Sequence, residues 1–91
     1  MIIVSYDISD DKTRTRFSKY LKNFGHRLQF SVFEIVVSER MLDVIETEIN
    51  NKYLKKFTQE DSVIIFRLSN TCKITRYGYA ANDNDDFIIV E

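Results

Sequence analysis

The sequence predicts a single domain of the α+β class, and three observations support that prediction. The chain has 91 residues, which is the length of one domain. It contains no proline and only two glycines, so no linker divides it. Short runs of β-branched and aromatic residues alternate with two segments whose apolar residues recur at helical spacing. The composition, 44% hydrophobic and 30% charged, is that of a folded domain.

The first expected elements are a strand and a helix. Residues 2–6 form a short β-branched and aromatic run, and the turn-like polar residues 7–11 follow it. Asp10 suits the N-cap of the next helix, and Gly25 suits its C-terminal stop. The apolar residues between them recur at i, i+3, i+4 and i+7, the spacing of one helical face: Phe17, Tyr20, Leu21 and Phe24.

The next region, residues 27–37, is strand-like, but its apolar alternation changes phase. The apolar residues fall into two sets, first Leu28, Phe30 and Val32, and then Phe33, Ile35 and Val37. A shift of one residue moves every side chain to the opposite face of a strand. The phase change therefore predicts a bend, a bulge or a very tight hairpin.

A second helix is expected after this region. Ser38 suits its N-cap, and Glu39 places a negative charge in its first turn, where the helix dipole favours one. Three apolar residues at helical spacing form its expected core stripe: Leu42, Ile45 and Ile49. The helix is expected to end near residues 50–51.

Two further apolar runs complete the predicted fold. Residues 63–68 are expected to form a strand, and residues 87–90 a last strand that is suited to pairing with a neighbouring chain. The order of elements predicts a ferredoxin-like βαββαβ sandwich, one domain over residues 1–91, with an extra C-terminal strand. A chain this short buries a modest core, so we also expect self-association.

Composition argues against several classes of protein. Cys72 is the only cysteine, which excludes an internal disulfide and a cysteine-based zinc site and fits a reducing compartment. The opening apolar run, residues 1–4, is too short for a signal sequence or a membrane span, so we expect a cytoplasmic protein without a membrane partner. The sequence has no serine or cysteine catalytic motif, no glycine-rich phosphate loop and no dinucleotide fingerprint.

Charge is balanced overall, with 13 Lys and Arg against 14 Asp and Glu, but basic residues gather in one region. Residues 12–27 hold six basic residues and no acidic one: Lys12, Arg14, Arg16, Lys19, Lys22 and Arg27. Either this is the solvated side of an amphipathic helix, or five of these residues contact nucleic-acid phosphates, namely Lys12, Arg14, Arg16, Lys19 and Arg27. Similarly, Tyr6 and Phe33 either stack on bases or belong to the core.

The candidate catalytic and metal-binding residue is Asp7, at the carboxyl end of the first expected strand. A single carboxylate is a poor Mg²⁺ site, because Mg²⁺ takes about six oxygen ligands in octahedral order. In a twofold dimer, however, a residue near the axis appears twice and becomes a carboxylate pair. Such a pair would hold an ion that activates water for phosphodiester hydrolysis. The alternative is that Asp7 only ends the strand in an Asx-type turn.

Two sequence blocks resemble a known family. They are VSYDISDDK at residues 4–12 and QFSVFE at residues 29–34, with Arg14, Arg16 and Gly25 between them. Together they closely resemble the second CRISPR-associated protein, the small core subunit of the spacer-acquisition machinery. This resemblance implies a ferredoxin-like homodimer whose last strand, residues 87–90, joins the sheet of the partner. It also implies a Mg²⁺ site on the twofold axis, built from Asp7.

The resemblance leaves three functions open. Members of that family are described as metal-dependent endonucleases acting on single-stranded RNA or double-stranded DNA, and also as non-catalytic scaffolds that bridge dimers of the CRISPR integrase and hold DNA. A toxin-like messenger-RNA interferase of related fold is a third interpretation. The residues that match positions implicated in the family are Tyr6, Asp7, Arg14, Arg16 and Phe33, together with Arg27.

Overall fold

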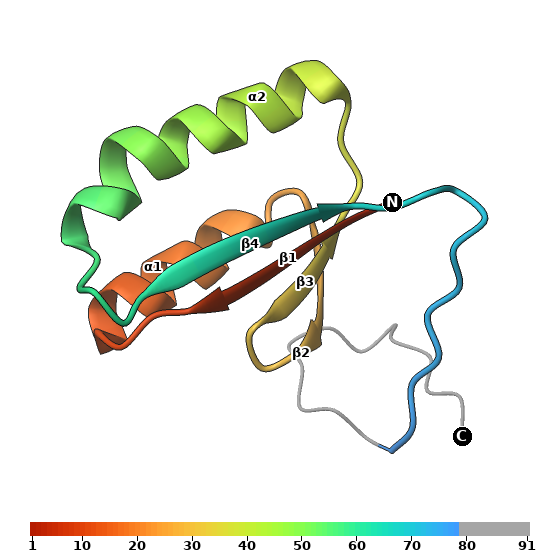
Figure 1. The fold of residues 1–91 in the computed structure, drawn as a ribbon, viewed down its shortest axis with the longest axis horizontal. Coiled ribbons are helices and arrows are strands. Elements are labelled where there is room, and N and C mark those ends of the chain that lie inside the picture. Colours follow the sequence, from red (N-terminus) through yellow and green to blue (C-terminus); the bar gives the residue numbers. More distant parts are fainter. Residues whose placement is uncertain (79–91) are drawn as a thin grey trace.

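The computed structural model describes residues 1–78 and contains four strands and two α-helices in the order βαββαβ (Figure 1). The elements are β1 (Ile2–Asp7), α1 (Asp11–Leu21), β2 (Gly25–Gln29), β3 (Val32–Ile35), α2 (Glu39–Glu48) and β4 (Ser62–Arg67). This order confirms the predicted α+β class. The expected strand at residues 87–90 lies outside the described residues.

The strands form one antiparallel sheet in the order β2-β3-β1-β4. Strand β1 lies between β3 and β4, and alternate β1 residues Ile2, Val4 and Tyr6 are buried. These side chains share one hydrophobic core with Phe17 of α1 and Leu42 of α2, both without exposed surface. Because one cluster joins both helices to the same face of β1, the core is a single layer between sheet and helices.

Both helices begin as the sequence predicts. Asp10 caps α1, because its carboxylate accepts hydrogen bonds from the backbone nitrogen of Thr13 at 2.9 Å and from the Thr13 hydroxyl at 2.8 Å. Ser38 caps α2, and its hydroxyl accepts a hydrogen bond from the backbone nitrogen of Met41 at 3.1 Å. The expected apolar face of α1 is also confirmed, since Phe17 and Leu21 are completely buried.

Two expected helix ends are wrong. Helix α1 ends at Leu21, and Gly25 instead begins β2, where a Cβ atom would collide with the backbone carbonyl oxygen of Glu34. Glycine is therefore needed there for the close approach of two strands. After α2, the chain continues through a π-helical turn (Ile49–Tyr53) and a 3-10 turn (Leu54–Lys56). The buried ring of Tyr53 packs edge-on against the ring of Phe17, with centroids 5.0 Å apart, which holds this extension on the core.

The phase change in the middle of the chain is confirmed as a hairpin with an irregularity. Strands β2 and β3 pair antiparallel around a short connection at residues 30–31, and their register shifts between Arg27 and Gln29. Leu28 lies within this shift and is buried, whereas Phe30 at the hairpin tip is 70% exposed. The hairpin tip therefore presents an aromatic ring to solvent.

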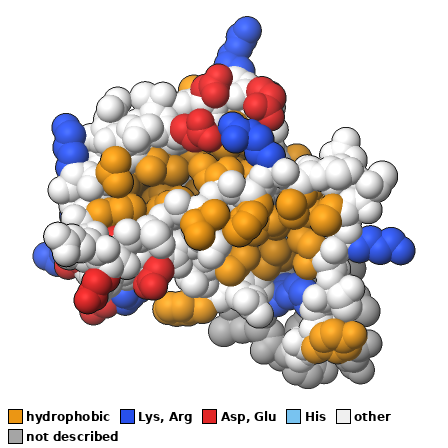
Figure 2. Space-filling model, in the orientation of Figure 1, with side chains coloured by type: hydrophobic (Ala, Val, Ile, Leu, Met, Phe, Trp, Pro, Cys, Tyr) orange, Lys and Arg blue, Asp and Glu red, His pale blue; other side chains and the backbone are white. Residues whose placement is uncertain are grey.

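The sheet face opposite the core carries apolar residues of its own. Ile64 and Phe66 of β4 are 51% and 43% exposed, while the alternate residues Val63 and Ile65 pack against the core. Figure 2 shows hydrophobic side chains gathered over the middle of the molecule on the side that carries β4. Within residues 1–78, no helix has both the length and the apolar character that a membrane crossing requires.

Candidate nucleic-acid interface

Asp7 is the last residue of β1, and its side chain is exposed. It pairs in the sheet with Ser62, the first residue of β4. Because side chains alternate along a strand, Tyr6 points into the core and Asp7 points to the other face. The carboxylate thus stands at the end of a rigid central strand and faces solvent, as the sequence predicts.

One protomer does not assemble a metal site around Asp7. Among residues 1–78, no group of three or more His, Cys, Asp or Glu side chains is placed to hold an ion. An exposed carboxylate has the oxygen donors that Mg²⁺ prefers, so Asp7 fits such an ion as part of a ligand set. Completing that set requires further donors from a second copy, a nucleic-acid phosphate or water.

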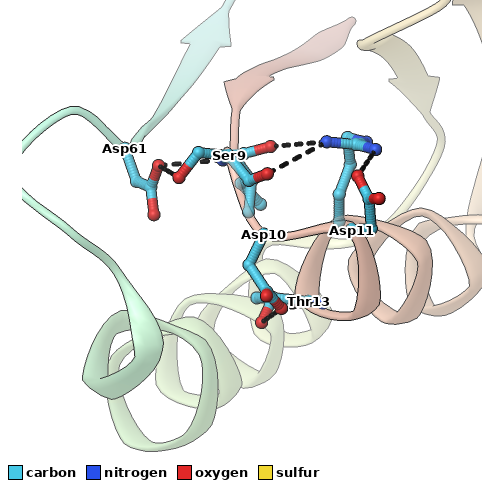
Figure 3. A network of polar contacts seen from close by, with 7 residues as sticks. Ser9, Asp10, Asp11, Thr13 and Asp61 are labelled. Atoms are coloured by element: carbon cyan, nitrogen blue, oxygen red, sulfur yellow. Dashed lines mark hydrogen bonds and ion pairs between the residues drawn. The ribbon is translucent and has the colours of Figure 1, made fainter.

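The loop that follows Asp7 is held from two sides (Figure 3). On one side, Asp61 accepts hydrogen bonds from the backbone nitrogen and the hydroxyl of Ser9, each at 2.9 Å. On the other side, Arg14 Nη1 donates a hydrogen bond to the carbonyl oxygen of Ile8 at 3.0 Å. The loop after Asp7 is therefore tied both to the connection before β4 and to α1.

Asp61 also accepts a hydrogen bond from the backbone nitrogen of Thr58 at 2.9 Å. The hydrogen bonds from Thr58 and Ser9 favour the carboxylate form and hold the pKa of Asp61 below its ordinary value. Nothing in the local sequence identified Asp61, because Ser9 is 52 residues away from it. The polar run at residues 58–62 is typical of a turn and does not indicate a contact with Ser9.

The two acidic residues that follow the loop, Asp10 and Asp11, lie at the N-terminus of α1, as expected. Asp10 caps α1, and its hydrogen bonds from Thr13 lower the pKa of its carboxyl group. Asp11 forms an ion pair with Arg14 in the first turn (Figure 3). Neither carboxylate belongs to a metal-ligating group within the described chain.

Helix α1 and the β2–β3 hairpin enclose a cationic hollow of about 300 Å³, which we call the basic pocket. None of its lining residues is acidic; they are Tyr6, Arg14, Thr15, Ser18, Lys19, Lys22, Arg27 and Phe30. The structure therefore brings together four of the residues predicted to bind nucleic acid: Tyr6, Arg14, Lys19 and Arg27. It adds Lys22 and Phe30, which were not among the residues predicted to bind nucleic acid.

Lys12 and Arg16, the other two predicted basic residues, do not line the basic pocket. Both are exposed and lie one turn apart on α1. Arg14 is only partly exposed, because its guanidinium group reaches the loop after Asp7. The basic residues of α1 thus form two groups, one lining the pocket and one on the outer face of the helix.

The structure places Phe33 in the core, which is the second of the two interpretations of this residue, and not in a position to stack on a base. Its ring has no exposed surface, so it has no face to offer to a base, and Tyr6 is only 4% exposed. The Tyr6 and Phe33 rings lie 6.3 Å apart inside the core. The guanidinium carbon of Arg27 lies 5.3 Å from the centre of the Phe33 ring, which is cation–π distance. The buried Phe33 ring therefore packs against the guanidinium group of Arg27, one of the cationic residues that line the basic pocket.

The fold and the site define a small α+β protein of ferredoxin-like order that presents clustered cations near a strand-end carboxylate. The family model for CRISPR associated protein Cas2 matches residues 1–76. The chain belongs to the Cas2 family.

Two curated relatives and two solved structures show the extent of the similarity. A Chloroflexus aurantiacus protein named CRISPR-associated endoribonuclease Cas2 3 is 34% identical over 87 residues, covering 91% of this chain and 88% of that one. A Rhodospirillum rubrum protein named CRISPR-associated endoribonuclease Cas2 4 is 35% identical over 74 residues, covering 81% of this chain and 57% of that longer relative. A hypothetical protein from Thermus thermophilus aligns with a TM-score of 0.68 and 25% identity over 91% of this chain and 93% of its own. Streptococcus pyogenes Cas2 shares the fold, with a TM-score of 0.65 and 24% identity over 77% of this chain and 87% of its own.

Proposed function

We propose that this chain acts as a homodimeric nucleic-acid-binding protein of CRISPR spacer acquisition, with Mg²⁺-dependent phosphodiesterase activity at two Asp7 residues paired across a twofold axis. The observation that supports this most directly is the position of Asp7. Its carboxylate is exposed at the end of the central strand β1, and the loop after it is tied by Asp61 and Arg14. Relatives of the chain are named endoribonuclease and endonuclease.

Dimerisation is supported by the apolar sheet face. Ile64 and Phe66 are large side chains exposed side by side along β4, on the face away from the core. Exposed apolar patches of this kind mark interaction surfaces in small domains. Among the strands of residues 1–78, β4 lies at the edge of the sheet, where its outer hydrogen-bonding groups can pair with a further strand. We assign this face and edge to a second copy of the chain, with residues 87–90 supplying the added strand.

The proposed chemistry divides between the chain and the ion. When bound, Mg²⁺ supplies a water of lowered pKa and neutralises charge on the phosphoryl oxygens. The oxygens of Asp7 would hold this ion, and the tether from Ser9 to Asp61 fixes the loop after Asp7. The basic pocket and the outer residues Lys12 and Arg16 bind the phosphates of the nucleic acid.

A second candidate is a non-catalytic scaffold that bridges dimers of the CRISPR integrase and holds double-stranded DNA in the cytoplasm. It is supported by the basic pocket, whose cationic side chains can contact phosphates without any cleavage. A scaffold needs the dimer and its basic surface, and does not need a reactive carboxylate. The same protein would then contact DNA through the basic pocket without cleaving it.

Both candidates are tested with Asp7→Ala protein. We would measure cleavage of single-stranded RNA and of double-stranded DNA with Mg²⁺, and spacer integration with the integrase subunit. Lost cleavage with normal integration supports an activity that integration does not require. Cleavage that equals the wild type contradicts the enzyme proposal, and lost integration by a correctly folded dimer contradicts the pure scaffold.

A further inference from the structure

Phe30 is an exposed aromatic residue at the mouth of the basic pocket. It lies at the tip of the β2–β3 hairpin and is 70% exposed. It lines the pocket together with Arg27 and four residues of α1. The hydroxyl of Tyr6 donates a hydrogen bond to the carbonyl oxygen of Phe30 at 3.4 Å. This bond holds the backbone at the hairpin tip and leaves the ring in solvent.

The pocket beside Phe30 has the chemistry of a phosphate site. Arg14, Lys19, Lys22 and Arg27 contribute positive charge, and the Thr15 hydroxyl contributes a hydrogen-bond donor, whereas the Ser18 hydroxyl donates to the carbonyl oxygen of Thr15 at 3.3 Å. Arg27 is supported from below by the Phe33 ring, which restricts its guanidinium group. A volume of about 300 Å³ is at the lower end of the range for small-molecule sites.

We infer that the basic pocket takes one unpaired nucleotide of a single-stranded nucleic acid, with its phosphate among the four cations and its base stacked on Phe30. The pairing of a cationic groove with an exposed aromatic ring is the general arrangement by which proteins bind single strands. The inference rests on the proposed nucleic-acid binding but not on cleavage at Asp7.

An intact duplex does not offer this contact. Its bases are stacked inside the helix, and taking one out costs a few kcal/mol. Lys12 and Arg16, on the outer face of α1, contact phosphates of single and double strands alike. Phe30 therefore distinguishes the two kinds of nucleic acid, whereas the outer basic residues do not.

The test compares the wild type with Phe30→Ala on three probes of one sequence: single-stranded RNA, single-stranded DNA and a blunt DNA duplex. The single strands carry 2-aminopurine, whose fluorescence falls when the base stacks. We expect Phe30→Ala to weaken single-strand binding by about 5- to 100-fold and to abolish the quenching. Duplex binding should change by less than about twofold. A loss of affinity for only one of the two single strands would support the nucleotide site and would show that it prefers RNA or DNA.

Three further variants, at Tyr77, Phe30 and Lys22, serve as controls. Tyr77→Ala removes another aromatic side chain, 78% exposed and outside the pocket, and should leave all three affinities unchanged. Phe30→Tyr keeps the ring and should retain binding and quenching. Lys22→Glu should lower the affinity for both the single-stranded probes and the duplex. Equal binding by Phe30→Ala and wild type, or equal losses on single strand and duplex, would overturn the inference. Because none of these measurements requires cleavage, an inactive Asp7 would leave them interpretable.

Discussion

Asp61 accepts two hydrogen bonds from Ser9, one from the backbone nitrogen and one from the hydroxyl, each at 2.9 Å. Ser9 lies two residues after Asp7, and Asp61 lies immediately before β4. One carboxylate thus joins the loop that leaves the candidate catalytic strand to the connection that enters its neighbour. This relationship makes Asp61 a positioning residue for the Asp7 loop.

Replacing Asp61 with Asn should loosen this loop. The amide nitrogen cannot accept a hydrogen bond, and the neutral amide oxygen accepts more weakly than a carboxylate, so the bonds from Ser9 are weakened even where only the bond from Thr58 is lost. We expect faster amide hydrogen exchange at Ser9 and a lower kcat for any cleavage, with little change in nucleic-acid affinity. Glu60→Gln, which neutralises the neighbouring carboxylate, is the control. Unchanged exchange at Ser9 in Asp61→Asn would contradict the positioning role.

Acid should destabilise the fold through two aspartates. Hydrogen bonds from Thr58 and Ser9 to Asp61, and from Thr13 to Asp10, lower the pKa of each carboxyl below its ordinary 3.8. A group with a lowered folded pKa stabilises the fold above its ordinary pKa, and this contribution is lost as the pH falls through the lowered value. In urea unfolding, the contribution of these two carboxylates to the free energy of unfolding should therefore be constant above about pH 5 and should be lost below about pH 4. The Asp10→Asn, Asp61→Asn double variant should lose less stability over that range; an equal loss would refute the assignment.

Much of the fold was predictable because the signals are local. The caps Asp10 and Ser38 each bond a residue three positions ahead, so the sequence window itself contains both partners. The hairpin was one of three structures predicted by the phase change between Val32 and Phe33, the others being a bend and a bulge. The helical extension to residue 56 was not predictable, because it depends on Tyr53 packing against Phe17, a contact 36 residues away in the chain.

The candidate site was predictable only in part. Asp7 and the basic residues could be named from the strand end and the run of cations, and the structure places Arg14, Lys19 and Arg27 around one pocket. The tether at Asp61 depends on a contact across 52 residues, which no local pattern reveals. Whether an aromatic residue on a strand faces a base or the core depends on the register of the hairpin, so the sequence left both interpretations of Phe33 open.

The Phe33 ring should matter for stability and not for direct contact with bases. Phe33→Ala removes a completely buried aromatic side chain, and we expect a loss of about 3–5 kcal/mol in the free energy of unfolding. Urea denaturation measures this loss, and Phe30→Ala, at an exposed position, is the control. A Phe33→Ala protein with wild-type stability and lost nucleic-acid binding would contradict the burial argument.

Nucleic-acid binding should depend steeply on salt. If about eight basic side chains of a dimer meet duplex phosphates, log K should fall against log salt with a slope near −7. Lys12→Ala removes two such contacts per dimer and should make the slope shallower by about 2. Fluorescence anisotropy with a duplex at several salt concentrations measures both slopes. An affinity that does not change with salt would contradict the placement of α1 in the nucleic-acid interface.

If two Asp7 carboxylates from two copies hold one divalent ion, as proposed, the number of ions bound per chain is fixed by the symmetry. Calorimetric titration with Mn²⁺, as a stand-in for Mg²⁺, should give about one ion for every two chains. The Asp7→Asn protein should remain a dimer by sedimentation and bind no ion at this site. One ion per chain, or undiminished binding by Asp7→Asn, would show that the two Asp7 residues do not share an ion.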